Sequence, residues 1–319
     1  MTTTERRACL AVFVVLVAVH LGVRDPAWHN ATYLAATLGS VVIAWRGVLA
    51  HRAAPRAWRL VAAAITLTFV GDLAYGAQDF LLEGSPGDAS IADPIWLAGY
   101  ATLAGALVRL LVPPRRTRQR PLVDVERLLD LGIVLVVATM VVWEVVDLRA
   151  VGPAAALLDR VLLAAYPVAD LLLVALAVIV LLTDGRRNRA AVHLLAGTGV
   201  WLFGDLVFLV AGRDGFNTQL EDLGWFTATW MAGIVLVALG TNQPDVVEVG
   251  RSGTAKEPTV GAGRLALAMA PMAVPVLLAV SPHRERSGSF SATLAVGSVL
   301  LVLFGYLRAL NLLRDRERA

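Results

Sequence analysis

Hydrophobic positions along the chain gather into long stretches, each close to the ~20 residues that an α-helix needs to cross the hydrocarbon core of a membrane. Short segments rich in arginine, aspartate, glycine and proline separate the stretches. This pattern predicts an all-α integral membrane protein with about ten transmembrane helices. They are expected near residues 8–23, 31–50, 57–81, 91–112, 126–147, 157–183, 189–212, 219–240, 262–281 and 289–312.

Composition agrees with this prediction. Hydrophobic residues make up 57% of the chain and charged residues 17%, and the mean hydropathy is +0.69. A soluble domain is about half apolar and about a quarter charged, so that class is excluded. The first stretch follows Arg6 and Arg7 like a signal-peptide core, but it ends in HLGVRDP without a small-residue cleavage site. We therefore expect a retained helix.

Basic residues predict the orientation. If the helices alternate in direction, all but six of the 28 basic residues fall on the side that carries both termini. The positive-inside rule then places both termini in the cytoplasm of a multi-pass plasma-membrane protein. The pI of about 9.4 reflects this basic inner rim and not a nucleic-acid-binding surface. The six outer basic residues are Arg24, Arg149, Arg160, Arg213, Arg284 and Arg286.

One pattern occurs twice. Residues 69–75 read FVGDLAY and residues 202–208 read LFGDLVF, and each is followed by an acidic residue and a tryptophan three positions apart, Asp93–Trp96 and Asp222–Trp225. Both stretches begin at an arginine-rich segment and end at an acidic one, so the two copies are expected to cross the membrane in the same sense. This predicts a parallel internal repeat.

The repeat and the loops between the helices divide the chain into six segments. They are an N-terminal helix (1–26), a first helical repeat unit (27–112), a connector helix (113–156), a second repeat unit (157–240), a cytoplasmic loop (241–261), and a C-terminal helical hairpin with a cytoplasmic exit stub (262–319).

Carboxylates inside apolar stretches are costly and therefore mark candidate functional sites. Asp72 and Asp205 are expected in the outer half of the bilayer and Asp170 near its middle. Tyrosines and tryptophans at helical spacing accompany them, which favours an outward-opening acidic and aromatic pocket for a small cationic or hydrogen-bonding ligand. The candidate ligand-binding residues are Asp72, Tyr75, Asp79, Tyr100, Tyr166, Asp170, Trp201 and Asp205.

A purely structural alternative explains the same residues. Each aspartate would hold a neighbouring helix through Tyr, Thr or Trp, since polar contacts between helices stabilise membrane bundles. The tryptophans near helix ends fit an interfacial aromatic belt, and Asp93 before Pro94 fits a helix N-cap. The belt residues would be Trp28, Trp45, Trp58, Trp96 and Trp225.

Motifs for catalysis or metal binding are absent from the sequence. Cys9 is the single cysteine, and the five histidines are scattered without an HExxH motif. GxSxG, Walker and GxGxxG motifs are absent as well. We therefore expect no catalytic residues, no metal site and no cofactor.

Four segments carry a resemblance to a known family: ADPIWLAGYATLAGALVRLL (92–111), AAYPVADLLLVALAVIVLL (164–182), FGDLVFL (203–209) and VLFGYLRALNLLRDRERA (302–319). Together they resemble the multi-pass membrane input module of actinobacterial signalling proteins, which precedes GGDEF, EAL or histidine kinase domains. Here no output domain follows, so the resemblance implies no catalytic residues. It implies an exit helix that passes a signal through the charged stub RDRERA.

Three functions are compatible with these patterns. The first is a non-enzymatic sensor or accessory signalling module. The second is a small-molecule or ion transporter that uses the intramembrane aspartates, and the weakest is an intramembrane enzyme acting on lipid. The expected partners are the lipid bilayer and, through the C-terminal stub, either a second copy of the chain or a separate cytoplasmic signalling protein. Nucleic acid is not expected.

Overall fold

The structure is a computed structural model. It describes residues 3–23, 25–51, 54–81, 90–111, 125–148, 157–184, 188–211, 224–249, 275 and 288–318, with only the backbone described at some helix ends.

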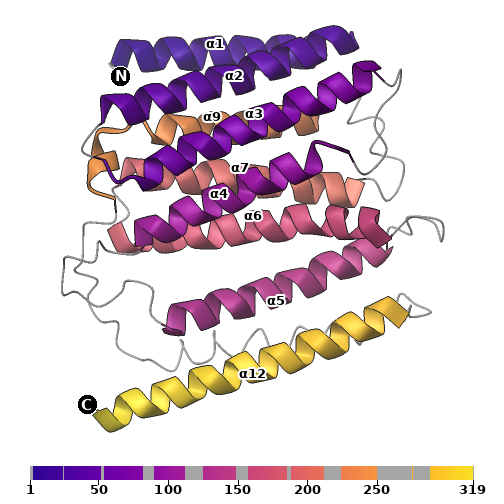
Figure 1. Ribbon diagram of the computed structural model, residues 1–319, viewed down its shortest axis with the longest axis vertical. Coiled ribbons are helices and arrows are strands. Elements are labelled where there is room, and N and C mark those ends of the chain that lie inside the picture. Colours follow the sequence, from indigo (N-terminus) through magenta and orange to yellow (C-terminus); the bar gives the residue numbers. More distant parts are fainter. Residues whose placement is uncertain are drawn as a thin grey trace. The chain divides into compact units, whose positions relative to one another are not determined.

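Within these ranges the chain is helical and contains no strand, which confirms the all-α prediction (Figure 1). The helices lie close to the predicted hydrophobic stretches, and the last one continues further into the charged C-terminal residues than its apolar stretch does. They are α1 (Thr3–Gly22), α2 (Pro26–Ala50), α3 (Ala57–Leu81), α4 (Asp93–Leu111), α5 (Val125–Leu148), α6 (Leu157–Asp184), α7 (Arg189–Ala211), α9 (Trp225–Gly240), the short 3-10 helix η1 (Pro244–Val247) and α12 (Gly288–Arg318).

Six of the described helices are long and apolar enough to cross a membrane: α2, α3, α4, α6, α7 and α12. Three described apolar helices are shorter, at Arg7–Gly22, Leu131–Trp143 and Trp225–Gly240. The predicted stretch 262–281 lies outside the described residues, apart from Pro275. The structure thus supports a membrane protein with six candidate spans.

Helix ends follow local sequence signals. Asp25 precedes α2, and its carboxylate accepts hydrogen bonds from the backbone N–H groups of Ala27 (2.9 Å) and Trp28 (3.3 Å). Pro26 occupies the first helical position, where its missing N–H costs nothing. The interior Pro167 does not end α6, which is one helix from Leu157 to Asp184.

The chain folds as two compact units. Unit 1 contains Met1–Gln119 and Leu173–Thr254, and unit 2 contains Arg120–Leu172 and Ala255–Ala319. The first half of α6 therefore belongs to unit 2 and its second half to unit 1.

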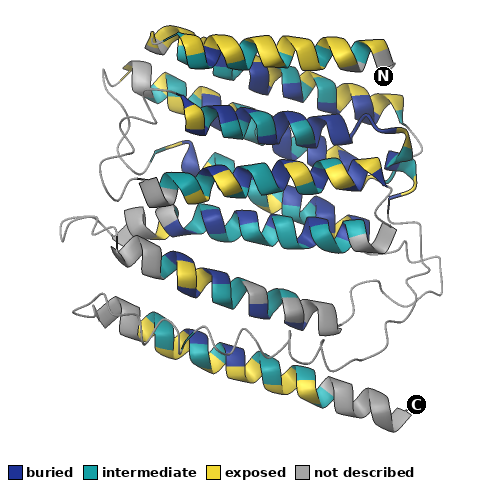
Figure 2. Cartoon of the chain, turned by 180° about the vertical axis from the view of Figure 1, so that it is seen from behind, coloured by how far each residue is buried: buried dark blue, intermediate teal, exposed yellow. Residues whose placement is uncertain are grey.

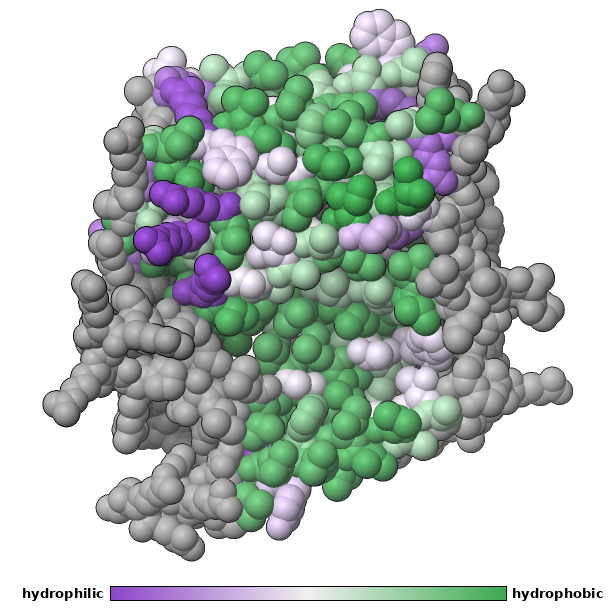
Figure 3. Space-filling model, in the orientation of Figure 1, coloured by the Kyte–Doolittle hydropathy of each residue, from purple (hydrophilic) through white to green (hydrophobic). Residues whose placement is uncertain are grey.

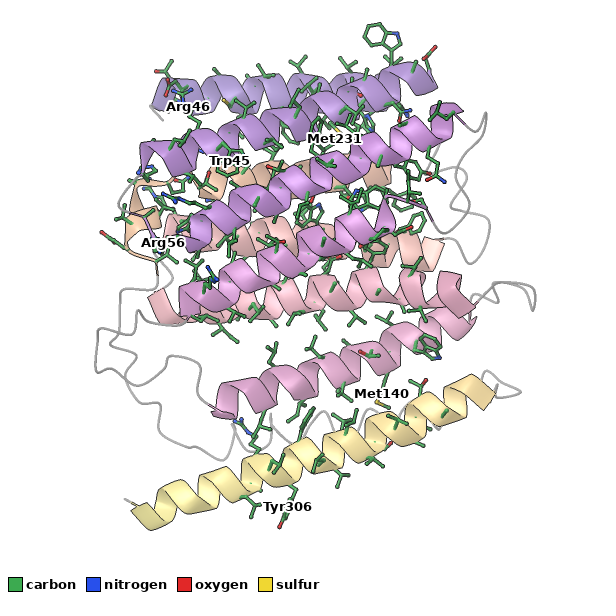
Figure 4. All side chains as sticks on the ribbon, in the orientation of Figure 1. Trp45, Arg46, Arg56, Met140, Met231 and Tyr306 are labelled. Carbon is green, nitrogen blue, oxygen red and sulfur yellow. The ribbon has the colours of Figure 1, made fainter. Side chains whose placement is uncertain are left out.

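In unit 1, α3 packs on α4, α7 packs on α9, and α2 lies against both α3 and α9. Side chains such as Ile65, Leu194 and Met231 are fully buried among these helices, and Figure 4 labels Met231 there. In Figure 2, α1 at the N-terminus is mostly exposed, whereas dark blue buried residues mark helices further into the unit. The exposed face of α1 is apolar, as expected for contact with lipid, and includes Val12, Val14 and Val15.

Small residues set the close approach of α7 and α9. A Cβ atom added to Gly197 would lie 2.7 Å from the carbonyl oxygen of Gly233 and 2.6 Å from Cγ2 of Val237. A Cβ atom added to Gly233 would lie 3.0 Å from the carbonyl oxygen of Gly197. The two backbones pack at a distance that only glycine permits, as in membrane helix pairs that associate through small residues.

Helices α3 and α7 both begin beside η1. The indole N–H of Trp58, near the start of α3, donates to the carbonyl of Val246 (3.1 Å). At the start of α7, the carboxylate of Asp245 accepts from the backbone N–H groups of Arg189 (2.5 Å) and Ala190 (3.3 Å). Asn188 caps the next N–H, that of Ala191, at 3.0 Å. The first three N–H groups of α7 are therefore satisfied by side chains.

Replacing Asp245 with alanine removes the acceptors of the first two N–H groups of α7, those of Arg189 and Ala190. We expect the free energy of unfolding to fall by about 1–2 kcal/mol, as for other lost helix N-caps. Reversible unfolding in mixed micelles measures this change. Glu248→Ala, at an exposed position four residues from η1's start, is the matched control. Equal effects of the two substitutions would contradict the capping role of Asp245.

In unit 2, α5 packs on α12 around Ile133, Met140 and Leu301. Glycines again make the contact close. A Cβ atom added to Gly297 would lie 2.4 Å from the sulfur of Met140, and one added to Gly132 would lie 2.9 Å from the ring of Phe304. The sequence thus encodes a helix pair in which Met140 and Phe304 each face a glycine of the other helix.

Candidate functional site

Asp72 lies in the GDL sequence of α3 and is buried, with 6% of its surface exposed. Its Oδ1 atom accepts a hydrogen bond from the indole N–H of Trp96 on α4 at 3.0 Å. The hydroxyl of Tyr33 on α2 donates to the same oxygen at 3.5 Å, and the hydroxyl of Thr37 also faces this carboxyl group. Three helices therefore meet at one carboxylate.

Asp205, in the GDL sequence of α7, makes the corresponding contact with α9. Its Oδ1 atom accepts from the indole N–H of Trp230 at 2.7 Å. In both cases an aspartate on a GDL helix accepts from a tryptophan on the helix packed against it. The two pairs have nearly the same separation along the chain, 24 residues for Asp72–Trp96 and 25 for Asp205–Trp230.

The glycine before each aspartate makes room for the indole. A Cβ atom added to Gly71 would lie 2.4–2.5 Å from the pyrrole atoms of Trp96. One added to Gly204 would lie 2.3 Å from the hydroxyl of Thr229 and 3.2 Å from the indole nitrogen of Trp230. The Gly-Asp pair thus acts together, since glycine lets the ring approach and aspartate accepts its N–H.

Tyr33 links the two pairs. Its hydroxyl contacts Asp72, and Asp205 is close enough to act electrostatically on the same hydroxyl. We call the set of Asp72, Asp205, Tyr33, Trp96 and Trp230 the acidic cluster. All five residues belong to unit 1.

Three further predicted site residues lie in unit 1. Tyr75 is 37% exposed, and its ring centroid lies 5.7 Å from that of Trp96. Tyr100 on α4 stacks on the buried Trp201 of α7 at 6.1 Å. The indole N–H of Trp201 donates to the backbone carbonyl of Trp230 at 3.2 Å. Tyr100 and Trp201 therefore adjoin the acidic cluster, because Trp201 donates to Trp230 and Trp230 binds Asp205.

The remaining predicted residues are Tyr166, Asp170 and Asp79. Tyr166 and Asp170 belong to the part of α6 that is in unit 2, where Asp170 is fully buried and Tyr166 is partly buried. The side chain of Asp79 lies outside the described residues.

The contacts of the tryptophans differ from what their spacing in the sequence suggests. The tryptophan that donates to Asp205, as Trp96 donates to Asp72, is Trp230 and not Trp225, which is 53% exposed. Asp222, the predicted partner of Trp225 in the repeated spacing, lies outside the described residues. An aromatic belt does not describe Trp58, which is 1% exposed and donates to η1, nor Trp96, which binds Asp72. Burial of a polar N–H requires an acceptor, and both indoles have one.

The belt interpretation fits the other three positions better. Trp28 and Trp225 are largely exposed, and Trp45 is 36% exposed with its N–H donating to the hydroxyl of Thr66 at 3.0 Å. Asp93 differs from the predicted N-cap, because α4 begins at Asp93 itself. Its carboxylate turns back to accept from the backbone N–H of Ser90 at 2.6 Å and from the Ser90 hydroxyl at 3.2 Å.

Tyr33, Trp96 and Trp230 were not among the candidate ligand-binding residues. Aligning the two GDL copies on their aspartates would have found Trp230, because a tryptophan follows each aspartate at almost the same distance. Tyr33 has no such signal, since it lies on a helix outside both GDL sequences.

The acidic cluster offers carboxylate oxygens that accept hydrogen bonds from indole and phenol groups on neighbouring helices. Among the residues that the structure describes, no group of three or more His, Cys, Asp or Glu side chains is arranged to hold a metal ion. A cation or a hydrogen-bond donor is the ligand class that would compete with the tryptophans for these oxygens.

Comparisons with protein-family models, with curated proteins and with solved structures found no match to this chain.

Proposed function

We propose that the protein is a non-enzymatic polytopic membrane sensor or accessory signalling module of the plasma membrane. The observation that carries this proposal is the length of α12, a single helix from Gly288 to Arg318. Its apolar part, Ala292–Leu310, is long enough to cross the membrane, and the same helix continues through the charged residues 314–318.

The dimensions of α12 suit signal transmission. At 1.5 Å per residue, its 31 residues extend over roughly 45 Å, compared with about 30 Å for the hydrocarbon core. A helix of this length carries a rotation or translation from inside the membrane to its charged end. Either a second copy of the chain or a separate signalling protein would receive that movement.

The acidic cluster is the input site in this proposal. Helices α3 and α7 both begin at η1, and each binds the next helix through an aspartate and an indole, which supports a parallel internal repeat. A small cationic or hydrogen-bonding ligand that takes the place of an indole N–H would loosen one helix pair and not the other. A ligand shifts the equilibrium between two conformations only if it binds one of them more tightly than the other.

Exposed arginines support a cytoplasmic N-terminus. Arg46, Arg56, Arg59, Arg109 and Arg189 are exposed at the ends of helices of unit 1. Figure 4 labels Arg46 and Arg56 at the end that carries η1, and in Figure 3, drawn in the same orientation, hydrophilic side chains gather there beside a broad hydrophobic surface. Arg46 also pairs with Glu5 of α1 at 2.6 Å. Under the positive-inside rule this end faces the cytoplasm.

A fusion of the full chain to a histidine kinase output domain tests the proposal without knowledge of the stimulus. Asp205→Asn keeps the shape of the side chain and weakens its bond to Trp230, so it imitates release by a ligand. We expect kinase output to change about fivefold or more, the usual size of coupling between sites. Trp225→Phe, at an exposed position, is the control and should leave output unchanged.

Unchanged output in both Asp205→Asn and Asp72→Asn, with normal amounts of folded protein in the membrane, would contradict the sensor function. Proton flux into proteoliposomes, followed with an internal pH dye and lost in Asp72→Asn, would instead identify a transporter.

A further inference from the structure

A second polar cluster lies in unit 1, where α1 meets α2 and α9, and it shares no residue with the acidic cluster. Its centre is His20, which is 1% exposed near the end of α1. The Nδ1 atom of its ring lies 2.9 Å from the hydroxyl of Thr32 on α2, and the Nε2 atom lies 2.5 Å from the hydroxyl of Thr227 on α9. Both ring nitrogens of one buried histidine thus contact hydroxyl groups on two different helices.

The hydrogen-bond donors and acceptors around this ring define two possible states. The hydroxyl of Thr32 can donate to the backbone carbonyl of Trp28 (2.8 Å) or of His29 (2.9 Å), and the hydroxyl of Thr227 can donate to the carbonyl of Gly224 (3.0 Å). Each hydroxyl has one proton, so each oxygen is left to accept from His20. When both hydroxyls donate to carbonyls, both ring nitrogens carry protons and the ring is cationic.

Neutral His20 cannot make the same set of bonds. One ring nitrogen would then be an acceptor, and one threonine hydroxyl would have to turn away from its carbonyl to donate to the ring. Burial opposes the charge, because moving a cation out of water is costly. The His20 ring therefore has a cationic form and a neutral form, which differ by one proton and one hydrogen bond.

Few other charges act on this ring. His29 on α2 stacks on His20, with centroids 4.5 Å apart and an angle of 24° between the rings, and its own charging would disfavour that of His20. Asp25, the cap of α2, is exposed and binds backbone N–H groups. Helix α9 carries no titratable side chain between Trp225 and Gly240, and the described part of α1 near His20 carries no other.

The stacking also argues against a metal site. The lone pairs of an imidazole lie in the plane of its ring, so two nearly parallel rings direct their nitrogens along parallel planes and not to one point. Gly224 closes the cluster, with a left-handed backbone (φ 65°) and a position where a Cβ atom would lie 3.0 Å from Nε2 of His20.

We propose that His20 is a proton-binding site that fastens α1 to α2 and α9. With the proton bound, His20 donates to Thr32 and Thr227 together, and all three helices are joined. When the proton leaves, one threonine hydroxyl must turn from its backbone carbonyl to donate to the ring, so α2 or α9 loses a hydrogen bond within its own helix end. The site is separate from the acidic cluster and does not depend on the sensor function.

Nuclear magnetic resonance of the full chain in lipid nanodiscs, with ¹⁵N-labelled histidine and ¹³C-labelled threonine methyls, tests this site. The His20 ring, assigned by its loss in His20→Gln, is expected to change from two protonated nitrogens to one between about pH 5 and 8, where histidine commonly titrates. The methyl signals of Thr32 and Thr227 should follow the same midpoint. The methyl of Thr66, whose hydroxyl accepts from Trp45 and not from a histidine, should not.

Thr227→Val removes one acceptor of the cationic ring. Because hydrogen bonds to charged groups are strong, we expect the His20 titration to move to lower pH by about one unit, a tenfold loss of proton affinity. Thr227→Ser keeps the hydroxyl and should restore the wild-type midpoint. His193→Gln, on α7 near η1, is the control histidine and should leave the His20 titration unchanged.

A His20 ring that keeps one protonation state throughout this range would overturn the proposal. So would a Thr227→Val midpoint equal to that of the wild type. If Thr227→Val does not fold, Thr32→Val removes the other acceptor and should shift the His20 titration in the same direction. The titration of the wild-type protein alone decides whether the ring takes up a proton.

Discussion

Gly197→Val will abolish the close packing of α7 on α9 and strongly destabilise unit 1. The new side chain would meet the carbonyl oxygen of Gly233 at 2.7 Å and the backbone nitrogen of Val237 at 3.0 Å from its Cβ alone. These are backbone atoms, so neither helix can give way by changing a rotamer. We expect a loss of about 3 kcal/mol or more, at the upper end of overpacking effects.

Gly199 provides a matched control two residues along the same helix. A Cβ atom added there meets nothing within 4 Å. Gly199→Val introduces the same side chain and the same change in helix propensity, so its effect should stay within about 0.5 kcal/mol. Reversible unfolding of both variants in mixed micelles measures the difference. If the two variants were equally stable, the glycine contact between α7 and α9 would not be what brings the helices together.

Trp230→Phe is expected to have a smaller effect. It removes the N–H that donates to Asp205 at 2.7 Å but keeps an aromatic ring in the same place, and it leaves the backbone carbonyl of residue 230 free to accept from Trp201. Without this donor, the Asp205 carboxylate loses a hydrogen bond in an environment where little water is available to replace it. We expect a loss of about 1–3 kcal/mol, which combines the interhelical bond with the cost of a missing donor at the carboxylate.

Trp225→Phe makes the same chemical change on the same helix at a position that is 53% exposed. Its effect should be within about 0.5 kcal/mol. The double variant Asp205→Leu/Trp230→Phe should be less destabilised than the sum of its single variants, since removing both partners leaves no unsatisfied group. Simple addition of the two effects would contradict a direct bond between Asp205 and Trp230.

The positions of the helices could be predicted from the sequence because burial in lipid imposes a strong and local rule. An apolar stretch of about 20 residues has few alternatives to a helix, and α3 begins and ends at the predicted residues 57 and 81. Helix ends that depend on specific side-chain contacts were harder to predict from the sequence. The start of α7 depends on Asp245, which lies 56 residues further along the chain, and no local pattern reports that contact.

The candidate site was predicted in part for the same reason. Asp72 and Asp205 are conspicuous because carboxylates are rare in apolar stretches. Their partners are ordinary residues in such stretches, since tryptophan and tyrosine also occur at membrane interfaces. Choosing Trp230 over Trp225 requires knowing which face of α9 meets α7, and the spacing of acidic residues to tryptophans in the sequence pointed to the wrong one.

The contact between Trp58 and η1 has a consequence for the order of events during synthesis. The indole N–H of Trp58 finds its acceptor, the carbonyl of Val246, only after the ribosome has made 188 more residues. At 5–20 residues per second, this delay is roughly 10–40 s. The helices made before η1 are therefore inserted before α3 gains this contact. Helix η1 completes this end of unit 1. A nascent chain that is halted before residue 244 should therefore remain open to proteolysis at its arginine-rich end.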